Sequence, residues 1–383
     1  MKILTARERL QLVLSGQIPD RVPVSPFVQD EYLSYFYPKK TEVDRVYDAL
    51  ELARELDFDL IAKPRTLEIP HFLRKSFPSW KLGREKQVRN GRIYFRTTIE
   101  TPKKTLTQVL VGPDAGVASA GVHLSTQEYF LKDQEDIEAF IEFMPEIDSE
   151  TITEMNTITS QWRKALGEDG IAAPWGWCGV YNMVSQYRSI ESLMMDVYEI
   201  PDLYDALLSK LSGQMVIYNA HLASTELECV GIAGNIANGA IFGSDFFSAH
   251  VEPYEKPIID AIHSHGAYTI YHNCGMAKGL YSNYKRMGFT LWETVSEHPV
   301  GDNTLQDAKG YFGDSMCLLG NLDQVHFLKT ASPHEVAGKT REIMETGKPG
   351  GFYIFSTSDF LEKGTPIENV KAMIEAAKDA GKY

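Results

Sequence analysis

The chain has 383 residues, and its hydrophobic fraction of 43% with 23% charged residues is typical of a soluble globular protein. The net charge of −14, without a dense basic cluster, argues against nucleic acid or an anionic membrane as partner and favours a small molecule or another protein. No apolar run is long enough to span a membrane and the first residues lack the apolar core of a signal peptide, so we expect a cytoplasmic protein.

Strands and helices are predicted to alternate along most of the chain. A short leading helix begins after Thr5, and segments of helical periodicity separate most of the apolar runs that follow. Eight of these runs are predicted strands, a number that favours a (β/α)8 barrel formed by one α/β domain over residues 1–383. A doubly wound open sheet is the alternative, but no G-x-G-x-x-G motif follows the first strand. The predicted strands are 22–27, 58–62, 171–177, 229–233, 268–272, 290–294, 317–321 and 353–356.

One region interrupts this alternation. Arg89-Asn90-Gly91-Arg92 is a hairpin signal, and stretches rich in Thr, Val and Ile follow it. We therefore predict an antiparallel β-hairpin insertion after the second strand, at about residues 80–130.

The four cysteines are widely spaced, which argues against a disulfide framework. We interpret Cys178 and Cys317 as packing residues. Cys274 differs because it follows His272 by two positions at the end of a predicted strand. Residues two apart on a strand point to the same side, so this pair could hold one metal ion; an ordinary buried His and Cys is the alternative.

Other polar and aromatic residues follow the predicted strands and should meet at the carboxyl end of the barrel, where barrel enzymes place their chemistry. Glu293 and Asp359 could add oxygen ligands to zinc; otherwise Glu293 would pair with a basic residue and Asp359 would cap a helix. The expected substrate contacts, four aromatic side chains and one amide, are Phe27, Trp175, Trp177, Tyr181 and Asn235.

Several motifs, spread over the whole chain, together resemble the uroporphyrinogen decarboxylase superfamily, which implies the (β/α)8 barrel that the strand pattern also predicts. They occur in the order expected for that superfamily. These motifs are Arg7-Glu8-Arg9, Pro19-Asp20-Arg21-Val22-Pro23, His272-Asn273-Cys274-Gly275, Gly320-Asn321-Leu322-Asp323 and the segment 364–373 with the ending Ala380-Gly381-Lys382-Tyr383.

Within that superfamily the chain resembles the zinc-dependent corrinoid methyltransferases, in particular the methyltransferase component of O-demethylases. The resemblance implies zinc on His272 and Cys274, with Glu293 near the place of an acidic ligand. Uroporphyrinogen decarboxylation is less favoured, because no arginine lies between Val22 and Asp44 to hold substrate carboxylates. Thiol-methylating members carry a cysteine six residues before the Thr-Pro motif, and this sequence has Asp359 there.

A carboxylate in place of a thiolate makes zinc harder and better matched to oxygen. We therefore expect Glu293 and Asp359 to be catalytic ligands in an O-demethylase, which moves a methyl group from an aromatic methyl ether to the cobalt of a separate corrinoid carrier protein. No D-x-H-x-x-G carrier motif occurs in the chain itself. Methyl transfer from methylcobalamin to a thiol is the alternative, and a homo-oligomer is compatible with the sequence.

Overall fold

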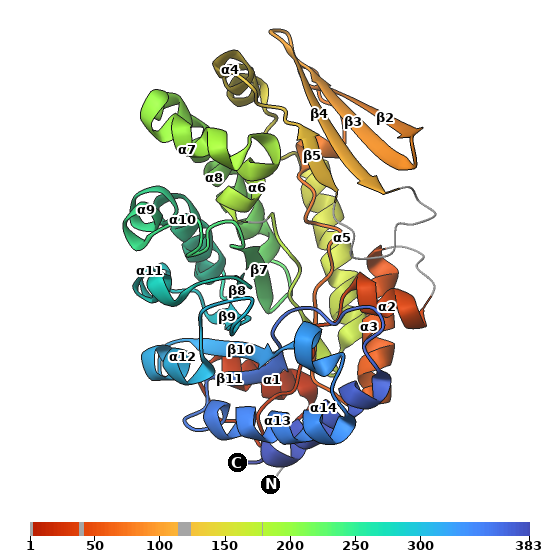
Figure 1. Cartoon of the computed structure of the whole chain (residues 1–383). Coiled ribbons are helices and arrows are strands. Elements are labelled where there is room, and N and C mark those ends of the chain that lie inside the picture. The colour runs from red at the N-terminus through yellow and green to blue at the C-terminus, as the bar shows by residue number, and fades with distance from the viewer. Residues whose placement is uncertain (1–2, 38–41, 114–123, 178) are drawn as a thin grey trace.

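Parallel strands run side by side around an apolar interior in the computed structural model, which describes residues 3–37, 42–113, 124–177 and 179–383 (Figure 1). Five of them form one sheet in the order β11-β10-β9-β8-β7, and β1 pairs with β6. The barrel strands are β1 (Leu60–Ala62), β6 (Gly170–Ala172), β7 (Cys229–Ala233), β8 (Tyr268–His272), β9 (Leu291–Glu293), β10 (Cys317–Leu322) and β11 (Tyr353–Thr357).

The segment 22–27 closes the ring between β11 and β1. Val24 forms a parallel bridge with Phe355 of β11, and its carbonyl accepts a hydrogen bond from Asp59, which precedes β1. On the other side, Trp175 bridges Gly231 and so joins the segment after β6 to β7. The predicted (β/α)8 barrel is confirmed, although the segments 22–27 and 173–177 are held by isolated bridges rather than regular ladders.

Helices follow the strands and cover the outside of the barrel. None of the described helices is long and apolar enough to cross a membrane. The helical elements are α1 (Ala6–Leu14), α2 (Asp30–Phe36), α3 (Glu42–Leu56), η1 (His71–Leu73), α4 (Gln134–Phe143), α5 (Ser149–Leu166), α6 (Val180–Tyr187), α7 (Ile190–Glu199), α8 (Pro201–Ala223), α9 (Ser244–His250), α10 (Glu252–Ser264), η2 (Lys278–Leu280), α11 (Tyr281–Met287), α12 (Leu305–Phe312), η3 (Gln324–Leu328), α13 (Pro333–Gly347) and α14 (Ile367–Ala380).

Helix α1 closes the amino-terminal end of the barrel. Thr5 and Glu8 form a capping box that starts this helix, and its apolar face carries Leu10, Val13 and Leu14. These side chains pack with inward-facing residues of the strands, such as Ile270, in one buried cluster. Cys317 belongs to the same cluster, which confirms it as a packing residue; Cys178 lies outside the described residues.

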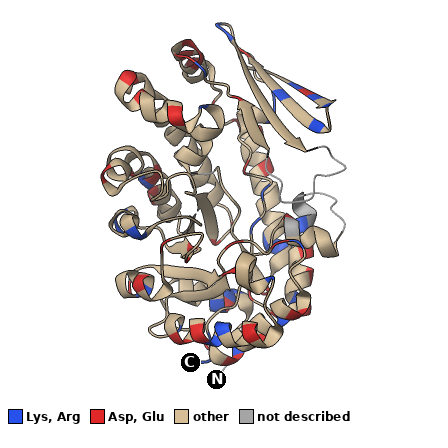
Figure 2. Cartoon of the chain, viewed as in Figure 1, with Lys and Arg blue, Asp and Glu red and all other residues tan. Residues whose placement is uncertain are grey.

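The insertion after β1 is larger than the predicted hairpin. Its strands pair antiparallel in the order β2-β3-β4-β5 and stand beside the barrel in Figure 1. Strands β2 and β3 together carry six basic and two acidic residues, whereas acidic residues are common on the helices (Figure 2). The four strands are β2 (Lys81–Arg89), β3 (Arg92–Glu100), β4 (Thr105–Pro113) and β5 (Ser125–Glu128).

Candidate metal centre and cavity

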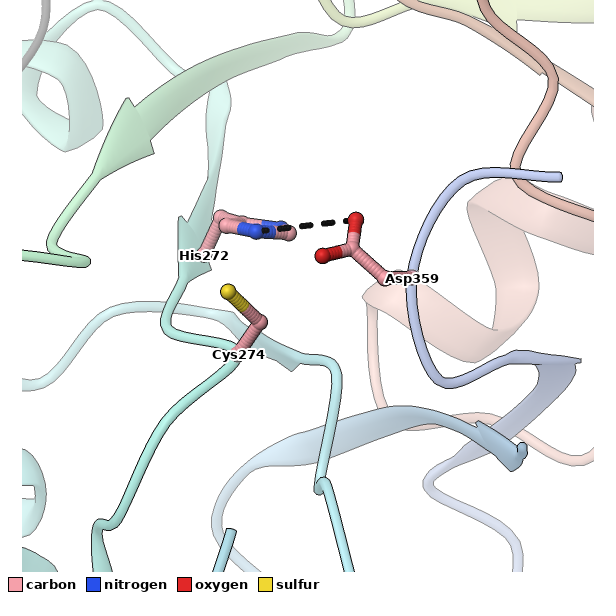
Figure 3. A group of neighbouring side chains, drawn as sticks. All are labelled: His272, Cys274 and Asp359. Carbon is pink, nitrogen blue, oxygen red and sulfur yellow. Dashed lines mark ion pairs between the residues drawn. The ribbon is translucent and has the colours of Figure 1, made fainter. Parts of the chain in front are cut away.

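Three potential metal ligands meet at the carboxyl end of the barrel. His272 is the last residue of β8, Cys274 follows it by two positions, and Asp359 lies in the loop after β11 (Figure 3). One ligand atom from each of the three lies within 4.8 Å of the others. A nitrogen, a sulfur and a carboxylate oxygen are all donors that zinc accepts, so the donor set fits that ion.

The ring of His272 is oriented from behind by Glu293. Strands β8 and β9 place these two residues in register, and His272 Nδ1 lies 3.0 Å from Glu293 Oε2. The other ring nitrogen, Nε2, faces Asp359 and lies 4.0 Å from its Oδ1 (Figure 3). A carboxylate that accepts the Nδ1 proton leaves Nε2 free for a metal, which is the usual support of a metal-binding histidine.

This arrangement does not support the expectation that Glu293 is itself a metal ligand. Its carboxylate lies behind the imidazole and is absent from the group of converging ligand atoms found among the described residues. The sequence also allowed Glu293 to pair with a basic residue, and the structure shows such a pair. Lys63 forms a buried ion pair with Glu293 Oε1. Glu293 is therefore placed to orient His272.

The electrostatics of these buried groups depend on one another. Burial alone would raise the pKa of Glu293, but the Lys63 ammonium and His272 lower it to about 2. Burial lowers the pKa of Lys63 against the attraction of Glu293. Burial would also lower the pKa of His272, yet its hydrogen bonds with Cys274 and Glu293 and the charge of Asp359 raise it to about 10. A metal on Nε2 must therefore displace a proton.

A cavity of about 370 Å³ opens beside the three ligand residues, a size suited to a small molecule. The rings of Phe27 and Trp175 line it and meet the His272 ring at centroid distances of 5.8 and 5.5 Å. The full lining consists of Phe27, Gln29, Arg65, Glu68, Trp175, Asn182, Gln186, Ala233, Asn235, His272, Cys274, Asp359 and Phe360.

Trp177 and Tyr181, two of the expected substrate contacts, do not line this cavity. Trp177 is buried against Phe72 and Tyr218, and the hydroxyl of Tyr181 is bonded to that of Tyr204. The expectation failed for Trp177 because β6 ends at Ala172, so the alternation of a regular strand no longer fixes the side of later side chains.

Asn235 lies on the cavity, but its amide is used by the protein. Its Nδ2 donates a hydrogen bond to the Cys274 sulfur over 3.3 Å. This contact holds the Cys274 sulfur at the edge of the cavity, beside His272. Its expected contact with a substrate hydroxyl stays a prediction.

Asp359 does not cap a helix, because the described chain continues from it without helical structure until α14. Its Oδ1 accepts a hydrogen bond from the Phe360 amide over 2.7 Å, and its own amide donates to Gln324 Oε1. These contacts hold the carboxylate facing His272 and Cys274.

Sequence reasoning missed several residues of this region, among them Lys63, Phe360, Asn182 and Gln186. Lys63 directly follows the last residue of β1, and Phe360 directly follows Asp359. Both therefore lie near strand ends, where the sequence predicted the site. Asn182 and Gln186 lie four positions apart on α6 and reach the cavity from there. Their spacing on one helix face is a weak signal, because most helices carry such pairs.

Comparison with known proteins shows the family of the chain. The family model described as uroporphyrinogen decarboxylase (URO-D) matches residues 135–380. Among curated proteins, Methylcobamide:CoM methyltransferase MtbA of Methanosarcina mazei is 22% identical over 198 residues, which are 51% of this chain and 55% of that protein. The Methylated-thiol--coenzyme M methyltransferase of the same organism is 22% identical over 201 residues, 52% of this chain and 51% of that protein.

Solved structures extend the likeness of the fold to the whole chain. A methyltransferase from Methanosarcina mazei matches with a TM-score of 0.71 and 17% identity, covering 98% of this chain and 99% of that one. A B12-independent methionine synthase from Shewanella sp. W3-18-1 matches with a TM-score of 0.53 and 11% identity, covering 94% and 97%. The curated relatives match over only about half their length. Since the family model covers more than half of this chain, the chain belongs to the uroporphyrinogen decarboxylase (URO-D) family.

Proposed function

We propose that this chain is a zinc-dependent methyltransferase that moves a methyl group from an aromatic methyl ether to the cobalt of a corrinoid held by a separate carrier protein. The observation that carries the proposal is the convergence of His272, Cys274 and Asp359 beside a cavity with aromatic walls. The relatives named as methylcobamide-using methyltransferases support the corrinoid part of the proposal.

Each residue of the site would have a distinct role. His272, Cys274 and Asp359 would hold zinc, which when bound supplies Lewis acidity at the ether oxygen. Glu293 would keep the His272 ring in one orientation, and Asn235 would hold the Cys274 sulfur in place through its hydrogen bond. Each of these residues contributes by holding a donor atom in place before the substrate arrives.

Phe27 and Trp175 are placed to contact a flat ring at the cavity wall. The reaction breaks the O–CH3 bond, the aryl oxygen keeps the bonding electron pair, and the methyl group passes to the reduced cobalt. The leaving group is a phenolate, whose conjugate acid has a pKa of about 10, so it departs more readily than an alkoxide.

A second candidate function is methyl transfer from a methylated corrinoid to a thiol. This candidate is favoured by the names of the relatives, which are coenzyme M methyltransferases. Asp359 argues against this candidate, since a carboxylate ligand favours an oxygen substrate over a sulfur substrate.

One experiment separates the two candidates. Zinc-loaded protein is mixed either with cob(I)alamin and 2-methoxyphenol or with methylcobalamin and a thiol, and the corrinoid spectrum is followed. We expect methylcobalamin to form from the ether; its consumption only in the presence of the thiol would refute the ether reaction. We expect Asp359→Cys to shift the ratio of the two rates toward the thiol, with Asp323→Cys as the matched control outside the converging ligands.

Metal analysis tests the common basis of both candidates. Freshly purified protein should contain zinc or regain activity when zinc is added. A zinc content below about a tenth of an equivalent, together with no activity after zinc is added, would refute a zinc-dependent mechanism for both candidates.

A further inference from the structure

Lys63 is a buried cation beside the candidate metal centre. It follows β1, its side chain is only 3% exposed, and its ammonium lies 3.4 Å from the centre of the Phe27 ring. A buried ammonium group is costly unless it is paired. Glu293 provides that pairing, because its Oε1 forms the ion pair with Lys63.

Both oxygens of Glu293 are thereby committed to protein donors. Oε1 accepts from Lys63 and Oε2 faces His272 Nδ1 over 3.0 Å. Turning this carboxylate toward a metal would break at least one of these contacts, and the side chains of Glu293 and Lys63 are both buried. Separating a buried ion pair leaves two uncompensated buried charges, so the pair resists such a turn.

We propose that Lys63 is a positioning residue that keeps Glu293 off the metal, so that one coordination position stays open to a small molecule. The inference rests on the proposed metal centre and adds to it the number of protein ligands, which would be His272, Cys274 and Asp359. Three protein ligands and one open position are typical of catalytic zinc sites, whereas four protein ligands are typical of structural ones.

Charge balance supports the same assignment. A neutral imidazole, a thiolate and a carboxylate offset the two positive charges of a zinc ion, and Lys63 and Glu293 offset each other. If Glu293 also bound the ion, the ligands would carry one negative charge more than the zinc ion can offset. The ion would then be a weaker electrophile. Lys63 would then be left as a buried, unpaired cation.

The test uses zinc X-ray absorption, which counts the sulfur atoms around the ion, with 2-mercaptoethanol as a small probe. In the zinc-loaded wild-type chain we expect one sulfur, from Cys274, and two after the thiol is added. In Lys63→Met we expect Glu293 to turn and fill the open position, so the count should stay at one. The matched control Lys63→Met/Glu293→Gln, which has neither charge, should again take up the thiol.

Two results would overturn the proposal. A wild-type sulfur count that does not rise with the thiol means that no position is open, and a Lys63→Met count that rises as in wild type means that Lys63 does not control Glu293. If Lys63→Met does not fold, Glu293→Gln is loaded with excess zinc to offset its weaker affinity, and its sulfur count should still rise from one to two with the thiol; a count that stays at one would overturn the proposal. Failure of wild type to bind any zinc would instead refute the proposed function.

Discussion

Two polar clusters, each with a buried residue at its centre, occupy opposite ends of the barrel and are built in different ways. The base cluster, at the amino-terminal end, consists of Arg9, Asp20, Arg21 and Asp59; the mouth cluster, at the carboxyl end, consists of His272, Cys274 and Asp359. In the base cluster Asp59 accepts from Arg9, from Arg21 and from the Val24 amide at 2.6 to 2.8 Å. In the mouth cluster His272 Nε2 and Asp359 Oδ1 are 4.0 Å apart.

The difference separates a structural network from a candidate binding site. Two arginines and two aspartates neutralise one another in the base cluster, and their hydrogen bonds join α1, the segment 22–27 and the start of β1. The mouth cluster brings ligand atoms together beside a cavity, and His272 Nε2 and Asp359 Oδ1 lie beyond hydrogen-bond distance of each other. Mutations should therefore affect stability at the base and metal binding at the mouth.

The largest effect is expected from Asp59→Ala. This change leaves buried arginines without their shared acceptor, so the free energy of unfolding should fall by about 3–5 kcal/mol. Urea denaturation of the metal-free protein measures it. The control is Arg54→Ala, which removes an exposed pair with Asp169 and should cost at most about 1 kcal/mol. Equal effects of the two changes would contradict the buried role of the base cluster.

Cys274→Ala should act in the opposite way. Loss of one of three donor atoms should lower zinc affinity by roughly a hundredfold or more, and turnover should fall with it. Loss of a residue that only hydrogen-bonds to a metal ligand already lowers metal affinity by about ten- to a hundredfold. The unfolding curve of the metal-free protein should change little. Competition with a chelator measures the affinity, and Cys317→Ala, inside the barrel core, is the matched control that should retain zinc. Full activity of Cys274→Ala would refute the site.

Glu293→Gln should give a smaller loss of metal affinity, about ten- to a hundredfold, because the amide oxygen can still accept from His272 Nδ1 but carries no charge. The same chelator competition measures it. An affinity as low as that of Cys274→Ala would mean that Glu293 binds the metal directly.

Glu255 offers the smallest and most local test, through pH. Burial raises its pKa to about 7, against the hydrogen bond that its carboxylate accepts from Tyr271. The folded chain therefore binds a proton that the unfolded chain releases between about pH 4.5 and 7, so this residue's contribution to stability should decrease as pH rises through that window. Glu255→Gln should remove that part of the slope in urea titrations at several pH values. An unchanged slope would contradict the shifted pKa.

The sequence alone determined the barrel and the central pair of the site. Apolar runs that alternate with helical periodicity predicted the strands, because burial on both faces of a barrel strand requires continuous apolar residues. The boundaries of β7 and β8 agree with the predicted runs. The two-residue spacing of His272 and Cys274 indicated that both side chains could face one side, and the structure brings them together although β8 ends at His272.

Only the tertiary structure decided the roles that depend on distant partners. Glu293 is placed to orient His272 because Lys63, 230 positions earlier in the chain, holds one of its oxygens and the register of β8 and β9 brings His272 to the other. Trp177 is a core residue because the chain leaves regular strand geometry after Ala172. Local patterns predict which side of an element a residue faces, but the neighbour that a charged group meets across the barrel is set by the packing of the whole chain.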